Sequence, residues 1–241
     1  MKLGTCAFFW ALLLLASLGP AAADPVFLSA SSTNPALLLP PPPADGSPAA
    51  KAEMAELHRI EKNRTADDLA SAKSDDRTED VTAFAAVMGP GFDLKVLPKT
   101  AKLFADVREE EKVAAKLAKD FFKRTRPYVA DPSLKSCANK SDAPKTSYPS
   151  GHATMGYSMA VVLAALAPEK AQTILARASE YAENRLVCGV HYRRDIVAGE
   201  ALGTAVGVEL MASPGFMAEF VAARDELRAA HLVADQGAIK P

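Results

Sequence analysis

The sequence predicts an all-α protein, folded as a single-domain helical bundle with buried central helices and an extended proline-rich N-terminal arm. From residue 47 onward, alanine, leucine, glutamate, lysine and arginine dominate, and apolar residues recur three and four positions apart, the period of an amphipathic helix. Valine and isoleucine are scattered and do not alternate with polar residues, so no segment has a convincing strand pattern.

Two segments precede the predicted bundle. Residues 1–23 combine a basic start, an apolar stretch and a small-residue end, which is typical of a secretory signal peptide cut after Ala23. An uncleaved anchor helix is the alternative, disfavoured because the apolar stretch is short for a bilayer. Residues 24–46 contain four consecutive prolines and no helical period, so we expect an extended arm, in part polyproline II. Residues 47–241 form the one domain, and the protein is predicted to be periplasmic or secreted.

Start signals divide this domain into helices. Ser47 and Ser213 each precede a proline, which places an N-cap serine before a first-turn proline, and Pro168 opens another helix directly. The expected helices cover residues 48–63, 65–73, 78–88, 98–125, 152–166, 168–186, 193–211 and 214–230.

Two stretches, residues 153–167 and 196–212, are apolar nearly all round. Such helices either span a membrane or form the buried centre of a bundle. Both are shorter than the roughly 20 residues of a span and both contain polar residues, which favours the buried centre. We expect them to form the core, with the chemistry at their N-terminal ends.

Charge and cysteine content limit the possible partners. The 28 Lys and Arg residues balance 29 Asp and Glu residues, so no overall basic field favours nucleic acid or an anionic membrane. After signal removal only Cys137 and Cys188 remain, and an even pair in an exported chain predicts one disulfide. Two free buried thiols are the alternative.

Three short motifs in fixed order carry the candidate chemistry: Lys119-x6-Arg126-Pro127, Pro149-Ser150-Gly151-His152 and Arg185-x5-His191-x3-Asp195. Lys119 and Arg126 are seven residues apart, nearly two turns, at the C-terminal end of the helix expected over residues 98–125, so both side chains emerge on one face and reach one anion. Pro127 disfavours helix at Arg126 and leaves its guanidinium at the helix terminus. A solvated basic face is the alternative, because the same helix carries Lys112, Lys116, Lys123 and Arg124.

The second motif begins an apolar helix. Ser150 stands at the N-cap position, where unpaired N–H groups and the positive end of the helix dipole favour an anion. Gly151 lets the backbone approach a ligand closely. Ordinary capping is the alternative, but it leaves His152 unexplained.

The third motif pairs a histidine with a carboxylate. Asp195 lies four residues after His191, so it can accept from one ring nitrogen and leave the other lone pair free to attack. An acidic residue that complements a helix N-terminus is the alternative. Arg185 adds a third cation, with a fork suited to phosphate. Together the motifs suit phosphoryl transfer without a metal, and the four histidines show no metal-ligand spacing.

With these three motifs the chain resembles the phosphatidic acid phosphatase type 2 superfamily, and more closely the class A bacterial nonspecific acid phosphatases. Those proteins are exported and all-α, with a proline-rich arm and cysteines placed like Cys137 and Cys188. The resemblance covers nearly all of the mature chain. One departure is Asn184, which stands where the family motif has serine before the arginine.

The resemblance implies a role for each motif residue. His191 would be the nucleophile that forms a phosphohistidine, Asp195 would hold its tautomer, and His152 would be general acid and then base. The phosphate would be held by Lys119, Arg126, Arg185, the Ser150 side chain and the Ser150 and Gly151 amides. No cofactor or metal is implied.

The expected function is therefore a metal-independent acid phosphatase of broad specificity for phosphomonoesters, with possible phosphotransfer to alcohols or nucleosides. Inhibition by phosphate or vanadate and a homodimer or higher homo-oligomer are also expected; nucleic-acid binding and stable membrane insertion are not. A vanadium haloperoxidase, a lipid phosphatase and a binding protein without catalysis are the alternatives.

Overall fold

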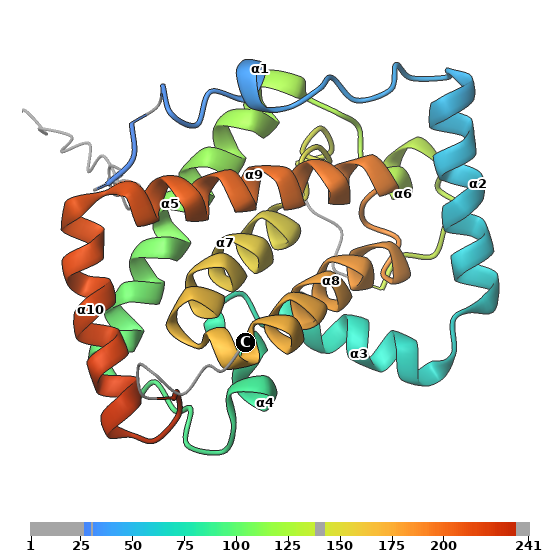
Figure 1. The fold of residues 1–241 in the computed structure, drawn as a ribbon. Coiled ribbons are helices and arrows are strands. Elements are labelled where there is room, and N and C mark those ends of the chain that lie inside the picture. Colours follow the sequence, from blue (N-terminus) through green and yellow to red (C-terminus); the bar gives the residue numbers. More distant parts are fainter. Residues whose placement is uncertain (1–26, 30, 138–142, 235–241) are drawn as a thin grey trace, which may run out of the picture.

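A computed structural model of the chain describes residues 27–29, 31–137 and 143–234 (Figure 1). The predicted signal peptide, residues 1–23, lies outside this range. Within the described residues the chain forms α-helices and short 3-10 helices and no strand, which confirms the all-α prediction. The helices are α1 Pro35–Leu38, α2 Pro48–Asn63, α3 Ala66–Arg77, η1 Val81–Phe84, α4 Ala85–Met88, α5 Pro98–Phe122, α6 Pro127–Ala130, α7 Gly151–Leu166, η2 Pro168–Lys170, α8 Ala171–Val187, α9 Arg193–Ala212 and α10 Pro214–Ala229.

Most helix starts follow the predicted signals. The Ser47 side chain accepts a hydrogen bond from the Ala50 N–H, as an N-cap serine should. Ser213 holds the N-cap position before Pro214, as predicted, although its side chain makes no capping hydrogen bond within the described chain. Other expectations were wrong in detail. The helix expected over residues 65–73 runs on to Arg77, and the helix expected over residues 78–88 is the 3-10 turn η1 followed by the short helix α4. Pro168 opens the 3-10 turn η2, and the α-helix begins only at Ala171.

The arm is extended only in part. Residues 40–43, the four prolines, have no regular secondary structure, but Pro35–Leu38 forms one helical turn that the sequence pattern did not predict. Asn34 caps this turn by accepting from the Ala36 N–H, and Pro35 supplies the fixed φ of a first helical residue. The Tyr148 hydroxyl donates to the Pro40 carbonyl at 2.5 Å, which ties the arm to the domain.

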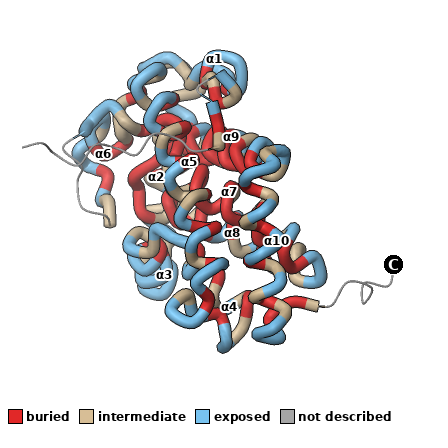
Figure 2. Tube along the Cα trace, turned by 90° about the vertical axis from the view of Figure 1, so that its left-hand side faces the viewer, coloured by how far each residue is buried: buried red, intermediate tan, exposed pale blue. Residues whose placement is uncertain are grey.

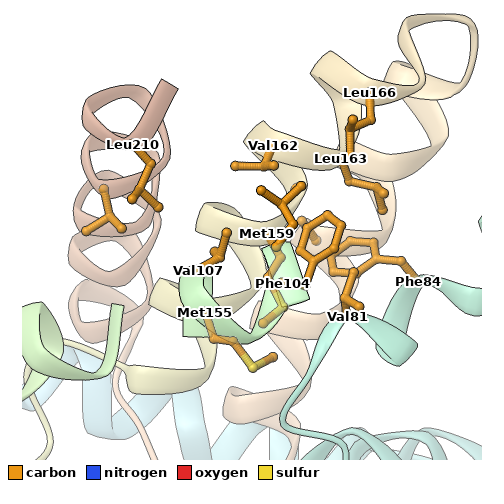
Figure 3. Packing of buried hydrophobic residues seen from close by; sticks show 14 of the residues in the cluster. Val81, Phe84, Phe104, Val107, Met155, Met159, Val162, Leu163, Leu166 and Leu210 are labelled. Carbon is orange, nitrogen blue, oxygen red and sulfur yellow. The ribbon is translucent and has the colours of Figure 1, made fainter. Parts of the chain in front are cut away.

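Helix α7 forms the centre of the bundle, with α5, α8 and α9 packed around it (Figure 1). Buried segments run through the middle of the molecule and exposed ones lie outside (Figure 2). In the core Met155, Met159 and Leu163 of α7 meet side chains of α5 and η1, among them Phe104 and Phe84 (Figure 3). The prediction of a buried central helix is confirmed for α7. It holds for only one face of α9, because Val197 and Val208 on its other face are 54% and 56% exposed. Among the described helices none alone is long and apolar enough to cross a bilayer; α9 and α10 pass that test only together, with a bend of 91° between them.

Glycines of α9 bring its backbone against α7. A β-carbon built on Gly203 would lie 2.2 Å from the Thr154 carbonyl oxygen, and one on Gly199 would lie 2.6 Å from the Ser150 carbonyl oxygen. Real β-carbons do not approach backbone oxygens so closely, so the helices would have to separate to admit a side chain.

Gly203→Ala should therefore destabilise the protein. Alanine favours a helix over glycine by about 1 kcal/mol, but forcing α7 and α9 apart costs about 3 kcal/mol, so we expect a net loss of about 2 kcal/mol. Urea unfolding followed by circular dichroism measures this change. Thr204→Ala, at the exposed next position, is the control and should stay within about 0.5 kcal/mol of wild type. Equal stability of Gly203→Ala and wild type would contradict this account of the α7–α9 contact.

Candidate active site

The three motifs meet where the C-terminal ends of α5 and α8 approach the N-terminal ends of α7 and α9. A cavity of about 420 Å³ opens there, and Lys119, Arg126, Gly151 and His152 line it together with charged residues of α5. Arg185, His191 and Asp195 are buried, at 4%, 1% and 0% exposure. The structure thus brings all three motifs to one place.

Lys119 and Arg126 converge by a different route from the one expected. Helix α5 ends at Phe122, because Lys123 adopts a left-handed conformation with φ of 50°. Arg126 is instead the residue before α6, where Pro127 favours its extended backbone (ψ 145°), and its N–H donates to the Pro144 carbonyl at 2.8 Å. The prediction of one helix over 98–125 with both cations on one face was therefore wrong, although both side chains line the same cavity.

His191 is held between a cation and a carboxylate. Its Nδ1 lies 3.4 Å from Asp195 Oδ2, and its Nε2 lies 2.8 Å from Arg126 Nη1. Because the guanidinium can only donate, Nε2 is the acceptor and the proton is assigned to Nδ1. Burial, reinforced by Arg126 and then Arg185, holds the pKa of His191 well below its usual range. The imidazole is therefore neutral, with its Nε2 lone pair directed towards a cation of the cavity.

Asp195 accepts several hydrogen bonds. Its Oδ1 accepts from Arg124 Nη1 at 2.6 Å, and its Oδ2 accepts from Ser147 Oγ at 2.5 Å and from the Tyr192 N–H at 2.9 Å. Burial raises the pKa of Asp195 to about 6, while Arg124 and these hydrogen bonds favour the charged form. The carboxylate is thus fixed in position beneath His191.

His152 lies at the cavity wall on the first turn of α7. Its ring stacks on Tyr181 with 5.7 Å between centroids, and its Nε2 lies 3.3 Å from the Asp76 carbonyl oxygen and 3.6 Å from Glu79 Oε1. Burial first, and then Arg185, hold the pKa of His152 well below its usual range. His152 therefore takes up a proton only at acidic pH.

Several buried donors of the cavity lack acceptors. Arg185 Nη2 bonds Asp76 Oδ1 at 2.7 Å, but its Nε and Nη1, and the Nε of Arg126, find no hydrogen-bond partner among the described residues. Unpaired buried cationic donors are costly, and an oxyanion would satisfy them. A β-carbon on Gly151 would lie 3.0 Å from Lys119 Nζ, so the glycine leaves room for the Lys119 ammonium group at the start of α7.

The Ser150 backbone amide is not available to a ligand, contrary to expectation. Its N–H donates to the Asp195 backbone carbonyl at 2.9 Å, and this bond joins the starts of α7 and α9. The Ser150 side chain caps α7 by accepting from the Ala153 N–H at 3.3 Å, so its hydroxyl proton can still be donated. Gly151 belongs to the first turn of α7, whose N–H groups lack intrahelical acceptors.

The predicted disulfide joins Cys137 and Cys188 and closes a separation of 51 residues. The Cys137 N–H also donates to the Cys188 carbonyl, so the segment before the second motif is tied to the end of α8. Asn184, which replaces the expected serine, is buried and donates to Asp75 Oδ2 at 2.7 Å. It links α8 to α3.

The sequence pattern missed the residues that support the motifs. Arg124, assigned to a possible solvated face, is only 5% exposed and pairs with both Asp195 and Glu53. Ser147 and Asp76 also contact motif residues. None of these positions belongs to a recognisable spacing, so no sequence signal could have identified them. Within the described part of the chain, no group of three or more His, Cys, Asp or Glu side chains is placed to hold a metal ion.

Anion binding should depend on the charge of Lys119. Burial, and then Arg126, lower the pKa of this lysine to about 8, so its positive charge is lost as pH rises through that value. Sulfate keeps a constant charge in this range, and we expect its affinity to fall about tenfold between pH 7 and pH 9.5, as measured by calorimetry.

The Lys119→Met variant is the control for this titration. It should bind sulfate weakly and lose the pH dependence. Burial also raises the pKa of the neighbouring Glu111 to about 7. A fall in affinity that persists in Lys119→Met would assign the titration to Glu111 and contradict the prediction for Lys119.

Comparison with known proteins agrees with this geometry. The PAP2 superfamily model matches residues 111–216, which include all three motifs. An acid phosphatase of Zymomonas mobilis is 33% identical over 204 residues, which cover 82% of this chain and 77% of the relative. A non-specific acid phosphatase of Salmonella typhi is 27% identical over 94% of this chain and 93% of its own length. One of Salmonella typhimurium is 30% identical over 60% of this chain and 59% of its own length.

Among solved structures, the first bacterial vanadium-dependent iodoperoxidase matches 72% of this chain and 52% of its own, with 20% identity and a TM-score of 0.49. The level of identity to the acid phosphatases, over most of both chains, establishes the relationship. The chain therefore belongs to the PAP2 superfamily and, within it, to the group of acid phosphatases.

Proposed function

We propose that this acid phosphatase hydrolyses phosphomonoesters through a covalent phosphohistidine at His191 and needs no metal ion. One observation carries the proposal most directly: the Nε2 lone pair of the neutral, buried His191 faces Arg126, which lines the cavity and, like Arg185, has buried donors without a partner among the described residues. Phosphoryl transfer requires mainly positioning and stabilisation of charge on the equatorial oxygens. Lys119, Arg126 and Arg185 supply that positive charge.

The first step is attack of His191 Nε2 on phosphorus. Arg126 Nη1, which donates to Nε2 in the structure, would turn to a phosphate oxygen and so free the Nε2 lone pair. As the P–N bond forms, the P–O bond to the alcohol breaks and the leaving oxygen takes the His152 proton. His191 then carries positive charge, which the Asp195 carboxylate stabilises through Nδ1–H.

The second step regenerates His191. Neutral His152 takes a proton from water as the water oxygen attacks phosphorus, and the P–N bond breaks with its electron pair returning to Nε2. The proton on His152 is then ready for the next substrate. An alcohol or nucleoside hydroxyl can replace water in this step, so phosphotransfer belongs to the same proposal.

The proposal predicts EDTA-resistant activity with an acidic optimum. Burial depresses the pKa of His152, so the protonated acid of the first step is lost as pH rises, and kcat/KM should fall towards alkaline pH. His191→Ala should lose at least about 1000-fold in kcat, because it removes the nucleophile. Hydrolysis of a chromogenic phosphomonoester from acidic to alkaline pH measures both quantities. Enzyme denatured with alkaline detergent during turnover should contain a phosphohistidine, which is stable to alkali and labile to acid.

Three outcomes would contradict this mechanism. Activity abolished by EDTA would mean that a metal performs the chemistry. Activity retained in His191→Ala would exclude the phosphohistidine. Phosphate binding without turnover in wild type would indicate a binding protein.

Added glycerol should give glycerol phosphate in the same assay, and phosphate or vanadate should inhibit competitively, because each would occupy the anion site.

We also infer that the protein is exported to the periplasm or beyond and forms a homodimer or higher homo-oligomer. The Cys137–Cys188 disulfide supports an oxidising compartment, where such bonds persist. Recovery outside the cytoplasm of a protein that begins at residue 24 would support export, and a full-length cytoplasmic protein would exclude it. Light scattering on that material gives the oligomeric state, and a monomer mass would refute the assembly.

A further inference from the structure

We propose that Arg124, held in place by Glu53, is a positioning residue for catalysis that fixes the Asp195 carboxylate in the orientation in which it holds His191. This inference rests on the proposed function and deepens it, because neither residue lines the substrate cavity or is one of the residues that define the three motifs; Arg124 occupies an unspecified position of the first motif. Glu53 also lies outside residues 111–216, the part of the chain that the family model matches.

The Arg124 guanidinium is held on three sides. Its Nη1 donates to Asp195 Oδ1 and its Nη2 to Glu53 Oε2, both at 2.6 Å, and its centre lies 4.1 Å over the Tyr192 ring. Glu53 is fixed in turn, because its second oxygen accepts from the Arg194 N–H at 2.7 Å in the first turn of α9. Arg124 and both of its acidic partners are buried. None of these side chains can rotate without losing a buried charge partner.

The two oxygens of Asp195 have separate partners. Oδ2 serves His191 Nδ1, together with Ser147 Oγ and the Tyr192 N–H, whereas Oδ1 is taken by Arg124. The contact to His191 is the longest of these, at 3.4 Å, so it does not by itself fix the carboxylate. Arg124 holds the far oxygen and thereby prevents rotation away from the imidazole. We therefore expect the Nδ1–H tautomer of His191 to depend on Arg124.

The attachment of α2 to α9 does not by itself explain the ion pairs among Glu53, Arg124 and Asp195. A buried ion pair often stabilises a fold no more than apolar residues of the same volume, and removing one partner leaves an uncompensated charge. The same two helices, α2 and α9, are already joined by the more exposed pair of Glu56 and Arg193 at 2.8 Å. This second pair touches neither Asp195 nor His191 and offers a matched control.

Arg124 also sets the charge of Asp195. Other titratable or charged groups around this carboxylate are His191, Arg126, Glu53, Tyr148 and Tyr192. Burial has already raised the pKa of Asp195 to about 6, and Arg124 is the main charge that opposes this effect. Without Arg124 the pKa rises further, so the acidic limb of the kcat profile should move to higher pH.

The experiment compares Arg124→Ala, Arg124→Lys and Glu53→Gln with the control Glu56→Gln, using the full chain and a chromogenic phosphomonoester. We expect kcat to fall about 100-fold in Arg124→Ala and about tenfold in Glu53→Gln, with KM within about threefold, because the phosphate-binding cations are unchanged. The acidic limb should move upward in Arg124→Ala, Arg124→Lys should recover part of kcat, and Glu56→Gln should behave as wild type.

Guanidinium ion supplies an independent test. Arg124 lines a second cavity of about 470 Å³, bounded also by Asp45, Lys51 and Asp131, which gives a small cation access to the space left by the truncated side chain. Millimolar guanidinium should restore kcat of Arg124→Ala at least about fivefold and return the acidic limb towards its wild-type position. It should not stimulate wild type or Glu56→Gln.

If Glu53→Gln and Arg124→Lys both show the kcat and the pH profile of wild type, Arg124 has no positioning role. The role is also refuted if Glu56→Gln loses as much kcat as Glu53→Gln. If Arg124→Ala does not fold by circular dichroism, the shape-conserving Glu53→Gln and Arg124→Lys variants decide the question. If the His191→Ala variant keeps wild-type turnover, the phosphohistidine mechanism is refuted, and this inference is refuted with it. Turnover that depends on His191 but not on Arg124 or Glu53 would refute this inference alone.

Discussion

The close contact of α7 with α9 is the constraint on which the site depends. Because Gly199 and Gly203 have no side chains, the two backbones meet near Ser150 and Thr154. This approach lets the Ser150 N–H donate to the Asp195 carbonyl and so fixes the start of one helix against the start of the other. Both helices begin at the cavity. The contact between the two helices therefore sets the relative positions of the motif residues at their N-terminal ends.

The site combines excess positive charge with low solvent exposure. Burial is the largest cause of the lowered pKa values of Lys119 and Arg126; Arg126 and Arg185 lower that of Lys119 further, and Arg185 lowers that of Arg126 further. Several of these donors find no acceptor among the described residues. A phosphate group would satisfy them and offset the repulsion between the cations. Burial first, and then Arg126 and Arg185, hold the pKa of His191 well below its usual range.

The carboxylates around the site have different tasks. Asp195 contacts His191 and Arg124, and the Asp76 carboxylate pairs with Arg185 while its backbone carbonyl oxygen lies 3.3 Å from His152 Nε2. Arg108 pairs with Glu111 and Glu79 at the cavity wall. These acids partly compensate the cations without filling the place of an anion, because each sits behind or beside a donor. The fold thus places the cations next to the polar cavity and the acids behind or beside them.

By itself the sequence determined most of the long helices, the disulfide partners and the residues that could carry chemistry, but not the single turns α1 and α6 or the 3-10 turn η1. Helical period, N-cap residues and prolines act within about one turn, so α2, α7 and α9 were placed almost correctly from local pattern. Only the tertiary structure decided where α5 ends, that the Ser150 amide is occupied, and that Arg124 is buried. The reason is the range of these interactions: Arg124 is 71 residues from Glu53 and from Asp195, and a local pattern holds no information about partners so distant.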